Sequence, residues 1–126
     1  MAIDEDYVRK GAKRVSDKDI QKVVRKATSI EAKVKKVGAL RKFLDNVGVM
    51  ISMVKDYCSG RYRQVPTWIV GAVVFVLLYV LNPFDLIPDF IPIIGYIDDA
   101  AVMAVALAMI GKDLDRYRLW KLENPE

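Results

Sequence analysis

Residues 67–81, TWIVGAVVFVLLYVL, are the segment that most restricts how this chain of 126 residues can fold. The run lacks the polar/apolar alternation of a half-buried strand, so it is read as a helix beginning near Pro66. Beyond Thr67 that helix has no polar face, so it needs apolar surroundings on every side. Its length is about 22 Å, against roughly 30 Å for the hydrocarbon core of a bilayer. The segment therefore predicts either a core helix or a marginal membrane span.

A second apolar run follows at residues 100–111 and continues a predicted helix to about residue 114. Its small side chains would let helices approach closely in lipid. The two helices predict a hydrophobic hairpin over residues 66–116, with a connecting turn rich in proline and aspartate and a C-terminal tail at 117–126. Because both runs are short, the hairpin is expected either to span a membrane or to dip into it.

The first half of the chain has a different character, because its charge is strongly basic. Residues 1–65 hold 16 Lys and Arg against 8 Asp and Glu, a net charge of +8; residues 66–111 hold four aspartates and no cation, a net charge of −4. Residues 1–15 show no sustained apolar period and predict a flexible arm. Residues 16–65 predict a pair of basic amphipathic helices.

The first of these helices begins at a capping-box pattern, Ser16 with Asp19, and is expected to stop at Gly38. The second is expected to end near Gly60. Apolar residues recur every three or four positions in both, which is typical of one buried helical face: Ile20, Val23, Val24, Ala27, Ile30, Val34 and Val37 in the first, and Leu40, Phe43, Leu44, Val47, Met50, Ile51, Val54 and Tyr57 in the second. The fold class is all-α.

Several functions are disfavoured by what the sequence lacks. The single cysteine, Cys58, cannot form an intrachain disulfide, and without histidine a zinc or haem site of the usual ligand set is not expected. No nucleophile motif accompanies a general base, so the chain is not expected to be an enzyme; a metal-dependent hydrolase using aspartates is the one exception kept. The first residues do not form a secretory signal, which favours a cytoplasmic-side location.

The turn between the apolar helices carries the most specific pattern in the chain, YVLNPFDLIPDFIPIIGYIDD over residues 79–99. This spaced set resembles the signature of the YkvA-like family, small helical proteins whose biochemical activity is unassigned. The resemblance covers about 45 residues and implies membrane association and a helical fold, without an activity. The residues that carry it are Tyr79, Pro83, Asp85, Leu86, Ile87, Pro88, Asp89, Ile91, Pro92, Gly95, Asp98 and Asp99.

Three interpretations of the four aspartates in this turn remain open. Asp85 and Asp89 each precede a proline by three residues, as at the start of a capped turn, and Asp98 and Asp99 fall where the next helix should begin. Their oxygens would alternatively suit Mg²⁺ or Ca²⁺. They would also suit the cations of a partner protein or the polar edge of a membrane.

The basic half likewise has two interpretations. Its cations would bind anionic lipids of the cytoplasmic leaflet, or they would form the solvated face of an ordinary helical bundle. Nucleic acid is not expected, because acids interrupt the lysines and the tyrosines form no stacking platform. Arg61 and Arg63 with Trp68 resemble a membrane-interface anchor, and the positive-inside rule places both termini in the cytoplasm.

Together these patterns predict a small membrane-associated helical protein acting as a scaffold or interaction module, alone or as a homo-oligomer. The alternative hypothesis is a soluble or peripheral helical bundle that binds a divalent cation through the aspartate-rich turn.

Overall fold

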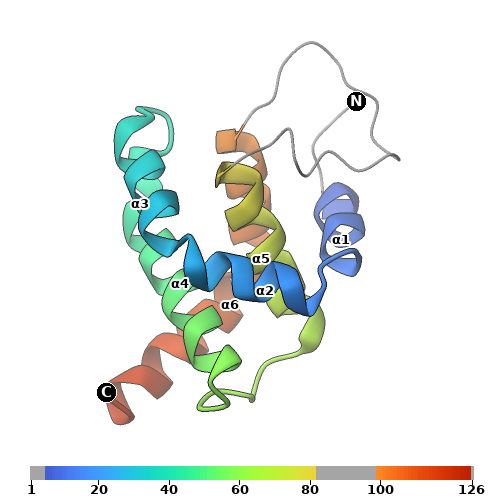
Figure 1. The fold of residues 1–126 in the computed structure, drawn as a ribbon, viewed down its shortest axis with the longest axis vertical. Helices are drawn as coiled ribbons and strands as arrows, with labels where there is room; N and C mark the ends of the chain where they lie inside the picture. Colours follow the sequence, from blue (N-terminus) through green and yellow to red (C-terminus); the bar gives the residue numbers. More distant parts are fainter. Residues whose placement is uncertain (1–4, 82–98, 126) are drawn as a thin grey trace.

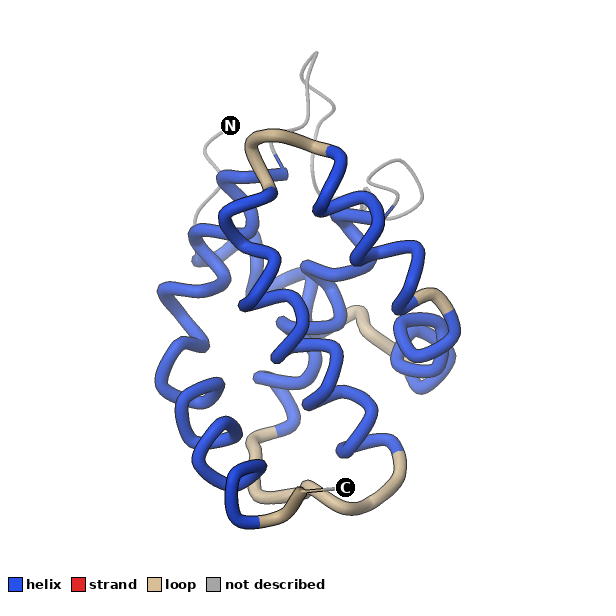
Figure 2. Tube along the Cα trace, turned by 90° about the vertical axis from the view of Figure 1, so that its left-hand side faces the viewer, coloured by secondary structure: helices blue, strands red, loops and turns tan. Residues whose placement is uncertain are grey.

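The protein is all-α, as predicted. The structure, a computed structural model, describes residues 5–81 and 99–125, and within these ranges there is no β-strand. Figure 1 shows the helices arranged as a bundle, and Figure 2 shows the same bundle from the side. The elements are α1 Glu5–Lys13, α2 Asp17–Arg25, α3 Ala27–Lys36, the 3₁₀ helix η1 Arg41–Phe43, α4 Leu44–Cys58, α5 Thr67–Leu81 and α6 Asp99–Glu123.

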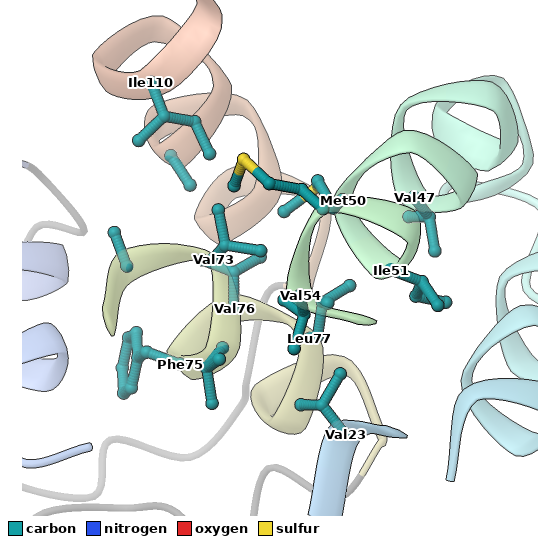
Figure 3. Packing of buried hydrophobic residues seen from close by; sticks show 14 of the residues in the cluster. Val23, Val47, Met50, Ile51, Val54, Val73, Phe75, Val76, Leu77 and Ile110 are labelled. Atoms are coloured by element: carbon teal, nitrogen blue, oxygen red, sulfur yellow. The ribbon is translucent and has the colours of Figure 1, made fainter. Parts of the chain in front are cut away.

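The apolar helix α5 lies at the centre of the bundle. Every residue from 69 to 80 is buried, and α5 contacts each of the other five α-helices. In Figure 3, Val73 and Val76 lie beside Met50 of α4, while Phe75 points away from them. The apolar surroundings that this helix needs on every side are therefore supplied by the chain itself. Within the described ranges, no helix has both the length and the apolarity to cross a membrane.

The prediction of a flexible arm over residues 1–15 is wrong for residues 5–13, because these residues form helix α1. This helix packs its small apolar face, including Tyr7 and Val8, against α5, and pairs Glu5 with Arg9 on its outer face. Nine residues are too few to show a sustained apolar period, and a helix this short is marginal in isolation. Packing against α5 is what stabilises it.

Two glycines allow α1 and α5 to approach closely. A Cβ atom built on Gly71 would lie 2.7 Å from the carbonyl oxygen of Ala12. A Cβ atom on Gly11 would overlap the ring of Phe75. A backbone oxygen cannot move aside as a side chain can, so any larger residue at position 71 must displace α1.

The first predicted amphipathic helix is divided in two. It begins as expected, with the Ser16 N–H donating to the Asp19 carboxylate at 2.9 Å, but α2 ends at Arg25 and α3 starts after Lys26. Figure 1 shows the chain changing direction between them. The apolar spacing continues across the break, so the sequence pattern does not mark it. Four of the seven residues predicted for the buried face are buried, namely Val23, Ala27, Ile30 and Val34. The other three, Ile20, Val24 and Val37, are partly buried and pack against the core.

The second amphipathic helix corresponds to η1 and α4. A 3₁₀ turn occupies its expected first residues, and α4 ends at Cys58. Gly60 follows with φ +86°, a left-handed conformation that favours glycine, so the predicted end is confirmed.

The last helix is longer than predicted, and the expected tail at 117–126 is largely helical. α6 extends to Glu123 and buries Leu114 and Tyr117. These residues continue an apolar face at three- and four-residue spacing among the charges, which the purely apolar pattern of residues 100–111 obscured.

Replacing Gly71 with alanine is expected to lower stability by about 1–3 kcal/mol, because the added methyl group overpacks the α1–α5 contact. Urea denaturation of the purified protein measures the effect. The matched control is Gly48→Ala in α4, where a Cβ meets nothing within 4 Å. That change is expected to be neutral or to stabilise by up to about 1 kcal/mol. Equal midpoints for the two variants would contradict the close approach.

Candidate functional site

A buried carboxylate, Asp56, lies at the end of α4 in the centre of a polar network. Among the residues that the structure describes, Asp56 is the one charged side chain that is buried, with 3% of its surface exposed. Arg61 donates to its Oδ1 at 2.9 Å, and Lys121 donates to its Oδ2 at 2.9 Å. The Tyr117 hydroxyl also donates to Oδ2, at 2.5 Å, and lies 2.5 Å from the Ser52 hydroxyl. We call these five residues the Asp56 network.

The network fixes the ionisation of its two acidic groups. Burial alone would raise the pKa of Asp56, but the Tyr117 hydroxyl and the cations of Lys121 and Arg61 outweigh burial and hold that pKa below its ordinary value. Burial, followed by the hydrogen bond to Asp56, raises the pKa of Tyr117 to about 12. At neutral pH the carboxylate is therefore charged and the phenol is protonated.

The chemistry of the Asp56 network is that of a structural link. Both carboxylate oxygens already accept hydrogen bonds, and two cations, Arg61 and Lys121, offset the single negative charge of Asp56. The network connects α4, the α4–α5 loop and the last turns of α6, and ring contacts of Tyr117 with Tyr62 and Trp120 surround it. Breaking such a group on one side leaves a buried charge without its partner, which is costly.

Sequence reasoning missed the Asp56 network. Asp56 is one polar residue near the apolar face of a helix, and its partners Tyr117 and Lys121 come 61 and 65 positions later. They also fall in the segment expected to be a tail. No local pattern connects residues so far apart in the chain.

The aspartate-rich turn lies almost entirely outside the described residues, so its three interpretations stay predictions. Asp99 is the first residue of α6, and the helix start expected there is confirmed. In the part of the chain that the structure describes, no three acidic or cysteine side chains are grouped as metal ligands would be. The other residues predicted for this site, Pro83, Asp85, Pro88, Asp89, Pro92, Gly95 and Asp98, lie outside the described ranges.

The remaining predicted site residues occupy different environments. Tyr79 is buried on α5, edge-to-face with the ring of Tyr7. Arg61 belongs to the Asp56 network. Arg63 lies over the ring of Tyr57, with its guanidinium carbon 4.4 Å from the ring centroid. Trp68 is 40% exposed, with the guanidinium carbon of Arg9 5.0 Å from its ring centroid.

A basic surface covers the side of the bundle formed by α2, α3 and η1. Residues 20–44 contain eight cations and one carboxylate, Glu31, a net charge of +7. The apolar faces of these helices pack in the core, so their cationic side chains point toward solvent. Six of the eight side chains are exposed and two are partly exposed. The basic surface comprises Lys22, Arg25, Lys26, Lys33, Lys35, Lys36, Arg41 and Lys42.

The hydroxyl group of Tyr117 is expected to stabilise the fold through the buried carboxylate. Tyr117→Phe should cost about 1.5–3 kcal/mol, as for other hydrogen bonds to charged groups. Tyr57→Phe is the matched control, because in the described residues the Tyr57 hydroxyl makes no hydrogen bond. Chemical denaturation at pH 7 compares the two variants, and an equal effect from both would exclude a special role for Tyr117.

Comparing Tyr117→Phe with the wild type is also expected to reveal how the contribution of the Tyr117 hydroxyl to stability depends on pH. The folded pKa of Tyr117 is about 12, above that of an unfolded tyrosine, about 10. The stabilisation from this difference is fully present below about pH 10 and is lost as the pH rises toward 12, by about 3 kcal/mol in total. The stability gap between the wild type and Tyr117→Phe should therefore shrink over this window. A constant gap between pH 8 and 11.5 would contradict the assignment.

Comparison with known proteins places the chain in a family. Residues 69–105 match the model of a family described as proteins of unknown function, DUF1232. This match runs from α5 through the aspartate-rich turn into α6, and excludes the basic surface and the Asp56 network. No solved structure matches the chain. A protein of Bacillus subtilis strain 168, named as the uncharacterized membrane protein YkvA, is 31% identical over 83 residues, which cover 66% of this chain and 78% of that protein. The resemblance found in the sequence is thus confirmed, and the chain belongs to the YkvA-like family.

Proposed function

We propose that this protein is a small membrane-associated interaction module that binds the anionic face of the membrane through its basic surface. The observation that carries the proposal is the density of charge on α2, α3 and η1, where eight cations accompany one carboxylate. The relative from Bacillus subtilis is named as a membrane protein, which supports the same location for this chain.

Lipid headgroups are the partner whose chemistry fits the basic surface. Anionic lipids attract juxtamembrane cations by about 1 kcal/mol per Lys or Arg near the surface. Ile30 and Val34 of the same helices have no exposed surface because they are packed in the core, and Ile20, Val24 and Val37 also pack against the core. Binding would therefore be electrostatic, would weaken with salt, and would leave α5 inside the bundle.

The proposal places the whole described chain on the cytoplasmic side of the membrane. The anionic leaflet of a cell membrane is the cytoplasmic one, so a basic surface that binds it keeps both termini on that side. Trp68, partly exposed and close to Arg9, is a candidate for additional contact at the headgroup level.

The proposed role is binding without catalysis. The carboxylate of Asp56 has the burial that an active site often provides, but its two oxygens are engaged by Arg61, Lys121 and Tyr117. Binding without a bound metal ion also predicts that membrane attachment persists in EDTA.

Vesicle co-sedimentation tests the proposal with the variant Lys35→Gln/Lys36→Gln/Lys42→Gln. All three side chains are exposed on the basic surface, so about 3 kcal/mol of attraction and more than tenfold in affinity for phosphatidylserine vesicles should be lost.

The matched control is Lys10→Gln/Lys13→Gln/Lys55→Gln, which removes the same charge from exposed positions elsewhere and should weaken binding less. Equal binding of the wild type to phosphatidylcholine vesicles, or an equal loss in both triple variants, would refute a specific lipid-binding surface.

A further inference from the structure

Helix α6 has an apolar face on each of its two sides. The inward side packs in the core through residues such as Met103, Ala106 and Ile110. The opposite side faces outward. Along it, six positions at spacings of four, three, four, four and three contain one charged residue, and the exposed residues Lys112, Arg116 and Glu123 lie beside this line. We call the six positions the outer seam of α6, and it consists of Ala104, Ala108, Gly111, Asp115, Leu119 and Leu122.

The outer seam is open to solvent in the single chain. Leu119 is 65% exposed and Leu122 is 78% exposed, more than any other large hydrophobic residue in the described ranges. Ala104 and Ala108 are exposed, and a Cβ atom on Gly111 would meet nothing within 4 Å. A helix that faces water normally carries charged residues on that side, as α2 and α3 do. The seam instead has the composition and spacing of a helix–helix contact.

We propose that the outer seam binds a second copy of this chain, with the two α6 helices antiparallel about a two-fold axis between residues 111 and 112. About this point the central part of the seam is self-complementary. Ala104 would face Leu119 of the other copy, Ala108 would face Asp115, and Gly111 would face Lys112, which lies beside the seam. In each of these pairs a large side chain meets a small one, which is the volume match that close helix packing requires, and Leu122 lies beyond them.

Charge selects the antiparallel orientation. In this pairing Asp115 lies between Ala108 and Lys112 of the other copy, which are one turn apart, so symmetry creates two Asp115–Lys112 contacts. A parallel pair would instead bring Asp115 against the same residue of the other copy and leave the leucines facing each other. Like charges in direct opposition disfavour that arrangement.

The remaining charges are compatible with this contact. Arg118, beside the seam, is already held by Asp45 at 3.1 Å, and Arg116 is paired with Asp113. The seam runs for about 27 Å along α6. One pair of helices buries less area than most permanent dimers do, so the dimer should dissociate on dilution. The contact does not involve the basic surface, and the inference does not depend on lipid binding.

Cysteine cross-linking of the full chain in lipid-free buffer tests the orientation. Cys58 is exposed, so all variants carry Cys58→Ser. Gly111→Cys lies beside the proposed axis and should cross-link to itself on oxidation. Leu122→Cys should not, because its two copies would be about 30 Å apart along the helices. Ala104→Cys should cross-link to Leu119→Cys in a mixture of the two proteins. Self-cross-linking of all four variants would mean a parallel pair, and none at Gly111→Cys would exclude the contact; both overturn the proposal.

Sedimentation velocity over a concentration series tests the charge contact. Asp115→Lys and Lys112→Asp should each weaken the dimer at least several-fold, and the double exchange should restore it. Leu119→Glu should abolish the dimer while leaving the thermal midpoint unchanged, since its side chain is outside the core. A wild-type chain that stays monomeric at all concentrations, or a double exchange no better than either single variant, would overturn the proposal.

Discussion

The structure depends on the need to cover α5 on every side. Its residues from 69 to 80 are apolar or small and are all buried, so the helix has no face that can be left in water. The chain meets this need with five helices, two of which are only nine residues long. Such short helices are marginal alone and exist because α5 gives them an apolar surface to pack against. Gly11 and Gly71 let one of these short helices, α1, approach α5 closely.

The Asp56 network gives the bundle its second constraint, because it fixes how α6 lies. Tyr117 and Lys121 can both reach one carboxylate only if the last turns of α6 face α4. That orientation sends Leu119 and Leu122 outward. The buried network and the exposed seam are thus two sides of the same helix, and a single rotational setting produces both. A polar group buried in this way specifies the arrangement even where apolar packing alone would tolerate alternatives.

The division of charge along the chain becomes a division of surfaces in the fold. The cations of residues 20–44 are on the outside of α2, α3 and η1 because the apolar positions of those helices are used to cover the core. The outer seam of α6 is apolar and nearly uncharged. The protein therefore presents two chemically different surfaces, one basic and one largely apolar, and the proposed lipid binding and the proposed dimer contact each use one of them.

The sequence alone determined the fold class, the central helix and most of the buried faces of the amphipathic segments, because each follows from composition or from spacing within one element. The family came from the resemblance of the motif in residues 79–99, which the comparisons confirm. The sequence did not determine the helix at Glu5–Lys13, the break at Lys26 or the extent of α6, since short or mixed segments take their structure from what they pack against. The Asp56 network was decided by the tertiary structure, because Tyr117 and Lys121 are more than 60 positions from Asp56 and only the packing of α6 on α4 brings them together. The same holds for α5: its pattern demanded apolar surroundings, and only the fold showed that the chain's own helices supply them.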